Sequence, residues 1–463
     1  MTVEQLYTNC LSEAAYFIES NGEAAVIDPL RDYQAYIALA AQKGVTIKYI
    51  FETHFHADFV SGHIDLANKT GAPIIYGPET VTNYPVTVAA NHHHFKIGAI
   101  DIEVMHTPGH TPESTCYLLR DESGEPHCIF TGDTLFVGDV GRPDLFGATI
   151  TKEEMASRMY DSLNEVKKLP DHVIVYPAHG PGSSCGKNIG KETWSTIGIQ
   201  KKLNYALQDL SRDEFIKAIT SGLSKPPQYF PLNAKINRQG YSSLDDVLQK
   251  SMHPMTAEEF AVEMKKGTLV IDTRHENIFE KGFVPGSVFI GLNGRFAEWV
   301  GTLISMDEPV LLVTETGKEE ETMIRMARVG YDNVIGFLQG GFDAWKNAGK
   351  EFDMVISIDA EEFNLDYKHD DIRVVDVRKE SEYEAGHVAG AVNVVLQQLD
   401  EQASKLDDKE ENLYVHCLGG YRSMIAASLL KRKGYHQLKN ITGGWQAIAK
   451  TDVAIELPKF SVS

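Results

Sequence analysis

The chain has 463 residues, more than one hydrophobic core usually serves, so at roughly 150 residues per domain we expect about three domains. Its 44 basic and 65 acidic residues give a formal net charge of −21, and because the acidic surplus is spread along the chain we exclude nucleic-acid and anionic-membrane binding. The five scattered cysteines form no disulfide framework, and we find neither a signal peptide nor a membrane-spanning run, so we expect a cytoplasmic protein with small-molecule ligands.

Up to about residue 250, short apolar and β-branched runs typical of strands alternate with helical patterns. The strand-like runs are 24–27, 47–51, 74–76, 100–105, 115–119, 128–131 and 173–176, and the helical patterns are 33–43, 61–69, 152–168 and 201–222. Two packed sheets flanked by helices would use all of these elements. A Pro-rich piece at 225–231 breaks the pattern, and its Tyr229 and Phe230 favour a tail packed on the first domain.

Six potential metal ligands follow four of the strand-like runs. The run that ends at Phe51 leads into the loop 53–63, and the other three runs lead into turns that contain Gly, Thr or Pro. The six residues are His54, His56, Asp58, His110, Asp133 and His179. Because imidazoles and carboxylates bind metal ions, a single site assembled from four strand ends explains them all. The run at 92–94 of three histidines matches no ligand spacing, so we assign it no ligand role.

After residue 250 the chain contains an internal repeat. Residues 271–274 (IDTR) match 375–378 (VDVR), and 340–342 (GGF) match 443–445 (GGW) at nearly the same offset. In each copy an Asp ends an apolar strand, and a central strand leads into a helical pattern. Such copies fit small sheets of parallel strands joined by crossover helices. We therefore predict domains at 1–250, 251–352 and 353–463.

The second copy carries Cys417 on a short Gly-containing loop that leads into a helical pattern at 424–433. Backbone N–H groups of Gly419 and Gly420, together with the positive end of the helix, would stabilise a thiolate or a Cys persulfide. Arg422 adds a fixed cation for sulfite or thiosulfate. In the first copy, aligned on the central strand, Glu315 takes the place of the nucleophile, so we predict that this copy is inactive.

The loop 53–63, with TPGHT at 107–111, TGDT at 131–134 and PAH at 177–179, resembles the glyoxalase II branch of the metallo-β-lactamase superfamily. The resemblance implies an αββα sandwich, and hence an α/β chain in which this sandwich precedes two rhodanese-like α/β domains. The usual loop of the family has a further histidine after the aspartate, which supplies the second metal position. Here that residue is Phe59. Because a phenyl ring cannot coordinate, we expect a site for a single metal ion.

Residue by residue, the first domain is most similar to the persulfide dioxygenases, and this resemblance implies one Fe(2+) per chain, held by His56, His110 and Asp133. Two imidazoles and one carboxylate are the ligand set expected of non-haem Fe(II) oxygenases. The remaining three residues of the cluster would then orient the ligands or bind the substrate, and they are His54, Asp58 and His179.

Two further residues of the first domain are candidates for substrate contacts. The resemblance implies that Arg142 lies near the thiol substrate as an anion contact, and the alternative is a structural salt bridge to Asp144 or a neighbour. Cys185 lies one turn beyond His179, either as a reactive thiol near the iron or as a small buried residue.

The Cys417 loop, with the segments 376–378 and 386–391, resembles a rhodanese domain. Together the resemblances cover nearly the whole chain and imply a persulfide dioxygenase fused to an inactive and an active rhodanese-type module. Such a protein, which we expect to be a homo-oligomer, would use oxygen to convert small persulfides, such as those of glutathione or coenzyme A, to sulfite and thiol. Cys417 would carry sulfane sulfur to or from sulfite and thiosulfate.

Two alternatives stay open. The first is a zinc thioester hydrolase like glyoxalase II, fused to a rhodanese sulfur carrier, and Phe59 argues against it. The second is a non-catalytic sulfur carrier in which only Cys417 matters.

Overall fold

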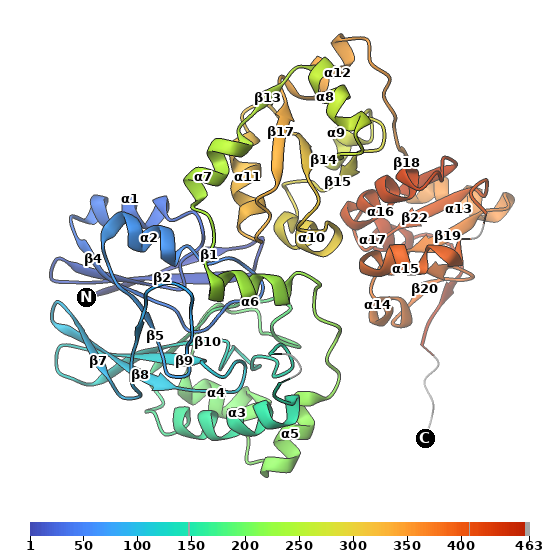
Figure 1. Cartoon of the computed structure of the whole chain (residues 1–463). Coiled ribbons are helices and arrows are strands. Elements are labelled where there is room, and N and C mark those ends of the chain that lie inside the picture. Colours follow the sequence, from blue (N-terminus) through green and yellow to red (C-terminus); the bar gives the residue numbers. More distant parts are fainter. Residues whose placement is uncertain (147–148, 407, 459–463) are drawn as a thin grey trace. The chain divides into compact units, whose positions relative to one another are not determined.

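The computed structural model describes residues 1–146, 149–406 and 408–458 (Figure 1). Contacts group residues 1–248 with 324–332 in one compact unit, and residues 249–323 with those from 333 onward in another. The first division lies two residues from the predicted boundary at 250. The boundary between 352 and 353 stays a prediction, because the contacts place both repeats in one unit.

Two six-stranded sheets form the centre of the first unit (Figure 1). In the first sheet, β1, β2 and β3 are antiparallel and β3 to β6 are parallel. In the second, ordered β12-β11-β10-β9-β8-β7, only the β10–β11 pair is parallel among the described residues. The strands are β1 (Thr2–Thr8), β2 (Glu13–Ser20), β3 (Glu23–Ile27), β4 (Thr46–Phe51), β5 (Ile74–Tyr76), β6 (Thr87–Val88), β7 (His94–Ile97), β8 (Ile100–His106), β9 (Thr115–Arg120), β10 (Pro126–Gly132), β11 (Ile174–Pro177) and β12 (Ser195–Thr196).

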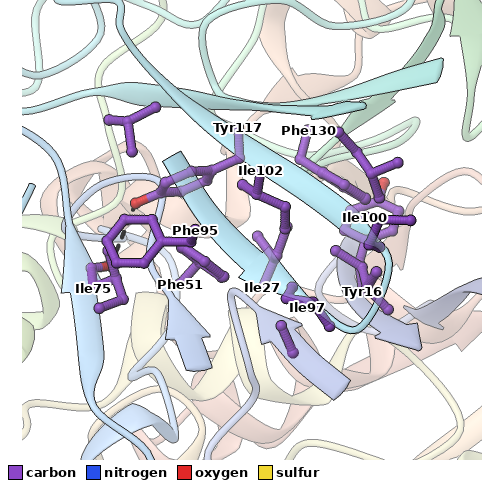
Figure 2. Close-up of a cluster of buried hydrophobic side chains, with 14 of the residues drawn as sticks. Tyr16, Ile27, Phe51, Ile75, Phe95, Ile97, Ile100, Ile102, Tyr117 and Phe130 are labelled. Carbon is purple, nitrogen blue, oxygen red and sulfur yellow. Dashed lines mark hydrogen bonds between the residues drawn. The ribbon is translucent and has the colours of Figure 1, made fainter. Parts of the chain in front are cut away.

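Alternation along the strands creates two kinds of buried surface. On β2, Tyr16 and Ile18 lie in the core between the two sheets, where Figure 2 shows Tyr16 together with Tyr117 and Phe130 of the other sheet. The alternate residue Phe17 lies in a second core with Tyr36 and Leu66 of the covering helices α1 (Gln34–Lys43) and α2 (His63–Thr70). Apolar side chains from both faces of one sheet are therefore removed from water.

Helices cover the outer faces of both sheets. On the second sheet, Met159 and Leu163 of α3 and Phe215 of α5 form the outer core. These layers confirm the predicted αββα sandwich. The helices are α1 (Gln34–Lys43), α2 (His63–Thr70), α3 (Lys152–Val166), α4 (Ile197–Leu203), the 3-10 helix η1 (Tyr205–Leu207), α5 (Arg212–Thr220), α6 (Phe230–Gln239) and α7 (Leu244–Ser251).

The helices differ from the sequence-based expectation at 201–222 and agree with it at Tyr229 and Phe230. The helix expected over 201–222 is split into three, because Asn204 leaves the helical conformation and Ser211 starts α5 with a capping box. Tyr229 and Phe230 are buried at the start of α6, as the tail interpretation required. Among the described helices of the whole chain, we find none long and apolar enough to span a bilayer.

The second unit contains two five-stranded parallel sheets of the same topology, ordered β13-β17-β16-β14-β15 and β18-β23-β22-β19-β21. This confirms two α/β domains after the sandwich. The first has β13 (Pro254–Met255), β14 (Leu269–Asp272), β15 (Val288–Phe289), β16 (Val310–Val313), β17 (Val334–Leu338), α8 (Ala257–Lys265), α9 (Glu276–Phe279), α10 (Phe296–Leu303), α11 (Glu319–Ala327) and α12 (Gly341–Asn347). The second has β18 (Ile356–Ile358), β19 (Arg373–Asp376), β20 (His387–Val388), β21 (Val392–Asn393), β22 (Leu413–His416), β23 (Leu438–Ile441), β24 (Ile455–Glu456), α13 (Ala360–His369), α14 (Glu380–Glu384), η2 (Leu396–Gln398), α15 (Leu399–Gln402), η3 (Ala403–Lys405), α16 (Tyr421–Arg432) and α17 (Gly444–Ile448).

The Asp-x-Arg motif of each copy closes a buried ion pair. In the second copy, Arg378 donates to both oxygens of Asp376 at 2.9 and 2.5 Å and to the Gly386 carbonyl at 2.8 Å. Its guanidinium carbon lies 4.6 Å from the ring centroid of Trp445. The Asp272–Arg274 pair of the first copy has the same arrangement. The repeated motif therefore has a structural role, because it ties the end of a strand to the following loop.

Candidate functional site

The ends of β4, β8, β10 and β11 meet at one buried cluster. The Nε2 atoms of His54, His110 and His179 lie 3.8, 3.3 and 3.4 Å from carboxylate oxygens of Asp133. The second carboxylate, that of Asp58, lies 3.5 Å from His179 Nε2. The structure thus assembles one site from four strand ends, as the sequence predicted.

The tautomer of His54 is fixed by a hydrogen-bond chain that starts at Asp28. The Thr53 hydroxyl donates to Asp28 at 2.8 Å, so it must accept its 2.9 Å hydrogen bond from Nδ1–H of His54. Nε2 of His54 then carries the free lone pair. Gly132 permits this approach, because a Cβ at that position would lie 2.6 Å from the Thr53 hydroxyl oxygen.

Backbone carbonyls fix the other two imidazoles in the same way. Nδ1–H of His110 donates to the Arg142 carbonyl at 2.8 Å, and Nδ1–H of His179 donates to the Ser12 carbonyl at 3.2 Å. All three Nε2 atoms therefore turn lone pairs toward the Asp133 carboxylate. Lone pairs and a carboxylate repel one another unless a cation lies between them.

Buried atoms without hydrogen bonds also fit a bound metal ion. Among the described residues, no hydrogen-bond partner reaches Nε2 of His54, Nε2 of His179 or either carboxylate oxygen of Asp133. Burial lowers the pKa of His54 well below its usual value, which keeps this imidazole neutral, as coordination requires. The ligand atoms of His54, His110 and Asp133 lie within 4.8 Å of one another, so these three residues would hold the ion.

The position of His56 corrects the predicted ligand set. Its Nε2 lies 3.1 Å from Asp28 and 3.7 Å from Glu52, and it also neighbours Asp58. Burial by itself lowers the pKa of His56, but the carboxylates of Asp28, Glu52 and Asp58 outweigh it and raise the pKa to about 9. Nε2 of His56 is thus engaged by carboxylates, whereas the ligand atom that lies together with those of His110 and Asp133 belongs to His54, so His54 takes the place that we predicted for His56. Asp28 was missed, although it follows the strand 24–27 directly and so had the signal of the other ligands.

Phe59 closes the side of the cluster where the family has a further histidine. The residue is fully buried, and its ring centroid lies 4.3 Å from that of His56. Asp58 and His179 form a further group of potential ligand atoms with His56, and His179 forms another with Asp133 and Cys185. Phe59 adds no ligand to either group. Burial raises the pKa of Asp58.

Arg142 is held by protein groups. Its guanidinium makes a bidentate salt bridge with Asp144 at 2.7 and 2.8 Å and donates to the carbonyls of Ser184 and Ser224. This geometry matches the alternative to the predicted anion contact. Arg142 acts on the site through its main chain, because its carbonyl orients His110.

Cys185 lies at the site but is buried. Its sulfur belongs to a group of ligand atoms with Asp133 and His179, and the residue is 1% exposed. Asp139 anchors the surrounding loop by accepting the N–H groups of Lys187 and Asn188 at 2.7 and 2.6 Å. Burial raises the pKa of the Cys185 thiol well above its usual value, which favours the neutral thiol over the thiolate.

Asn237 of α6 forms hydrogen bonds that hold the ligand loop, residues 53–63, in place. The sequence did not indicate this residue. Its amide nitrogen donates to the carbonyls of His56 and Phe59, both at 2.8 Å, and its oxygen accepts the N–H of Ser61 at 2.9 Å. We expect Asn237→Ala to lower metal affinity about tenfold or more and to cost about 3 kcal/mol of folding stability, because three buried backbone groups lose their partner.

The matched control for this variant is Asn233→Ala, one turn earlier on α6. Asn233 is equally buried, but its side-chain atoms have no hydrogen-bond partner among the described residues. Metal titration and denaturant unfolding should separate the two variants. Equal metal affinity in both would reject this role of Asn237.

The Cys417 loop connects β22 to α16. The N–H of Gly420 donates to the Cys417 sulfur at 3.1 Å, an interaction that favours an anionic sulfur. At the start of α17, Trp445 N–H donates to the Cys417 carbonyl at 2.7 Å and Gln446 N–H to the Leu418 carbonyl at 3.1 Å. These contacts from α17 fix the first part of the loop, directly before Gly419 and Gly420.

The first copy has Thr314 where the second has Cys417, which corrects the alignment on Glu315. In the sheets, Asp272 pairs with Val313 as Asp376 pairs with His416, so the next residues correspond. A Cβ on Gly341 would collide with the Thr314 carbonyl, just as one on Gly444 would collide with that of Cys417. The prediction that this copy lacks the thiol is unaffected.

Comparisons with known proteins agree with this division. Residues 8–179 match the family model of the metallo-beta-lactamase superfamily, and residues 256–348 and 359–451 each match the rhodanese-like domain. The chain is 33% identical to a metallo-beta-lactamase from Staphylococcus aureus subsp. aureus COL whose crystal structure covers 73% of this chain and 98% of its own, with a TM-score of 0.65.

Curated relatives match the first domain. The Schizosaccharomyces pombe protein named "Probable hydroxyacylglutathione hydrolase glo2" is 32% identical over 185 residues, which span 39% of this chain and 68% of the relative. A hydroxyacylglutathione hydrolase from Glaesserella parasuis is 28% identical over 225 residues, 43% of this chain and 90% of the relative.

Proposed function

The chain belongs to the metallo-β-lactamase superfamily and carries two rhodanese-like domains, and from this we propose that it is a bifunctional persulfide dioxygenase and sulfurtransferase. Its first domain would convert a small persulfide, oxygen and water to thiol, sulfite and two protons. Its last domain would move sulfane sulfur through Cys417 to or from sulfite and thiosulfate. The thiol carrier would be glutathione, coenzyme A or a similar molecule.

The observation that carries the proposal is a ligand trio for one metal ion beside a buried phenyl ring. His54, His110 and Asp133 present two imidazoles and one carboxylate, which is the ligand set of non-haem iron oxygenases with open coordination positions. His56 is engaged by carboxylates and Phe59 cannot coordinate, which disfavours a paired-metal site.

A bound Fe(2+) ion would supply the reactivity toward dioxygen that no side chain has. The residues of this chain hold and orient that centre. Thr53 and the Arg142 carbonyl keep His54 and His110 in the tautomers that leave Nε2 free. Asp58 Oδ1 and His179 Nε2, which have no hydrogen-bond partner in the described part of the chain, would receive hydrogen bonds from the substrate, and the buried ring of Phe59 would exclude water.

A thioester hydrolase is the second candidate, and the similarity to hydroxyacylglutathione hydrolases favours it. Such an enzyme would need a metal-bound water and would consume no oxygen. A non-catalytic sulfur carrier would have no metal-dependent turnover at all. The three functions thus differ in oxygen uptake and in the product.

The test uses the full chain, loaded with Fe(2+) without air and then mixed with glutathione persulfide and oxygen. We expect one oxygen molecule to be consumed for each sulfite released. The zinc-loaded chain should show no uptake, and neither form should hydrolyse S-lactoylglutathione at a comparable rate. Absence of oxygen uptake by the iron-loaded chain, with rapid thioester hydrolysis by the zinc-loaded chain, would establish the hydrolase instead.

We also propose a cytoplasmic location. The five cysteines all lie in the described part of the chain and carry free thiols, which suits a reducing compartment.

A further inference from the structure

Two ion pairs within the domain reduce the net positive charge around Cys417. Arg422, which interacts electrostatically with Cys417, donates through both terminal nitrogens to the two oxygens of Glu382 at 2.7 and 2.8 Å. The other arginine of this region, Arg378, forms an ion pair with Asp376. Each guanidinium around the loop is therefore neutralised by a carboxylate of the same domain.

His416, which precedes Cys417 in the chain, adds no positive charge. Burial lowers the pKa of His416, whose Nε2 lies 3.8 Å from Asp376, which favours the neutral imidazole. The helix end and the Gly420 N–H contribute partial positive charges only. None of these groups, nor Arg378 or Arg422, therefore offers Cys417 an unpaired full positive charge.

The two possible sulfur donors respond differently to this balance. A persulfide reacts as Cys417–S⁻ + RSSH → Cys417–SSH + RS⁻, where the bond between the two sulfurs of RSSH breaks and the thiol leaves as thiolate. Thiosulfate reacts as Cys417–S⁻ + S–SO₃²⁻ → Cys417–SS⁻ + SO₃²⁻, so a dianion must approach a thiolate and a dianion leaves. Only the second encounter needs an unpaired cation.

Resting on the proposed sulfurtransferase function, we infer that Glu382 is a specificity-determining residue, which pairs with Arg422 and thereby favours persulfides, whose reacting S–S group is uncharged as RSSH, over thiosulfate, whose reacting group is a dianion. Sulfur would then enter Cys417 from a persulfide rather than from thiosulfate. The side chains of Arg422 and Glu382 are 19% and 29% exposed, so solvent screens the pair and the effect is moderate.

The test compares Glu382→Gln with Glu380→Gln, a control on the exposed first turn of the same helix. Mass spectrometry of the full chain, without oxygen, gives the rate of persulfide formation on Cys417 from thiosulfate and from glutathione persulfide. For Glu382→Gln we expect the thiosulfate rate to rise about fivefold at low ionic strength, the persulfide rate to change less than about twofold, and the difference to shrink in high salt. Glu380→Gln should change neither rate.

The inference would be overturned if Glu382→Gln left the ratio of the thiosulfate rate to the glutathione persulfide rate the same as in the unmodified chain. An equal fall of both rates would overturn it too. Alkylation of Cys417 by anionic iodoacetate and by neutral iodoacetamide gives an independent reading of the same charge. We expect the iodoacetate-to-iodoacetamide rate ratio to rise in Glu382→Gln only. This ratio could rise in Glu382→Gln while neither donor transfers sulfur to Cys417 in the unmodified chain. That result would support the electrostatic role of Glu382 and reject the sulfurtransferase function.

Discussion

Replacing Cys417 with serine is expected to reduce thiosulfate formation from persulfide and sulfite by about three orders of magnitude or more, to the rate without protein. A serine hydroxyl cannot form the persulfide intermediate, because the transferred sulfur needs a sulfur nucleophile at the end of β22. Oxygen uptake and sulfite formation at the metal site should be unchanged, since the ligand trio lies in the other compact unit, and the sulfite that is no longer converted to thiosulfate should accumulate. The measurement is a parallel assay of oxygen, sulfite and thiosulfate on the full chain.

The control for this variant is Cys10→Ser, which removes a half-buried free thiol far from Cys417 in the sequence. It should leave all three rates unchanged. Because sulfite also reacts with persulfides in solution, the protein-free rate has to be subtracted. A thiosulfate yield in Cys417→Ser equal to that of the unmodified chain would reject Cys417 as the sulfur carrier.

The other large effect is a loss of bound iron, which we expect on replacing His54 but not on replacing His56. His54→Gln removes an imidazole whose Nε2 has no hydrogen-bond partner among the described residues, so iron affinity should fall by more than about a hundredfold and oxygen uptake should be lost. His56→Gln should keep about one iron per chain. It should instead lose about 3 kcal/mol or more of stability, because the buried carboxylates of Asp28 and Glu52 lose their cation.

Metal analysis after equilibrium dialysis and denaturant unfolding of both variants give these two quantities separately. If His56→Gln loses iron and His54→Gln keeps it, the originally predicted ligand set is right and the assignment from the structure is wrong.

The strand-end pattern explains why the location of the site could be predicted. A polar residue at the end of a buried strand has few places to lie, and the ends of strands in packed sheets meet, so His110, Asp133 and His179 could be brought together from the sequence. The choice between His54 and His56 could not. Both lie in the same irregular loop, and the decision depends on Asp28, which lies 25 positions before Thr53. The Asp28 carboxylate accepts a hydrogen bond from Thr53, the neighbour of His54, and lies 3.1 Å from Nε2 of His56.

Side-chain pairing was the part that the sequence left undetermined. From the sequence, Arg142 could either bind an anion or form a salt bridge. Only the geometry shows that its guanidinium pairs with Asp144. For Arg422 it indicated the cation but not its partner, since Glu382 lies 40 positions earlier on a separate helix. Long-range contacts between polar side chains have no periodicity that a single sequence could reveal.

Alignment of the two repeats was correct for the fold and wrong by one residue at the loop. The strand and Gly-Gly motifs placed both copies in the same topology, which the sheets confirm. Placing Glu315 opposite Cys417 failed because the loop residues have no shared pattern, whereas strand register identifies Thr314.

The most direct test of the central claim is X-ray absorption spectroscopy of the iron-loaded full chain. A lone ion held by His54, His110 and Asp133 predicts about one iron per chain, nitrogen and oxygen scatterers that include two imidazoles, and no metal–metal signal. A metal–metal distance of about 3.5 to 4 Å, with two ions per chain, would contradict it.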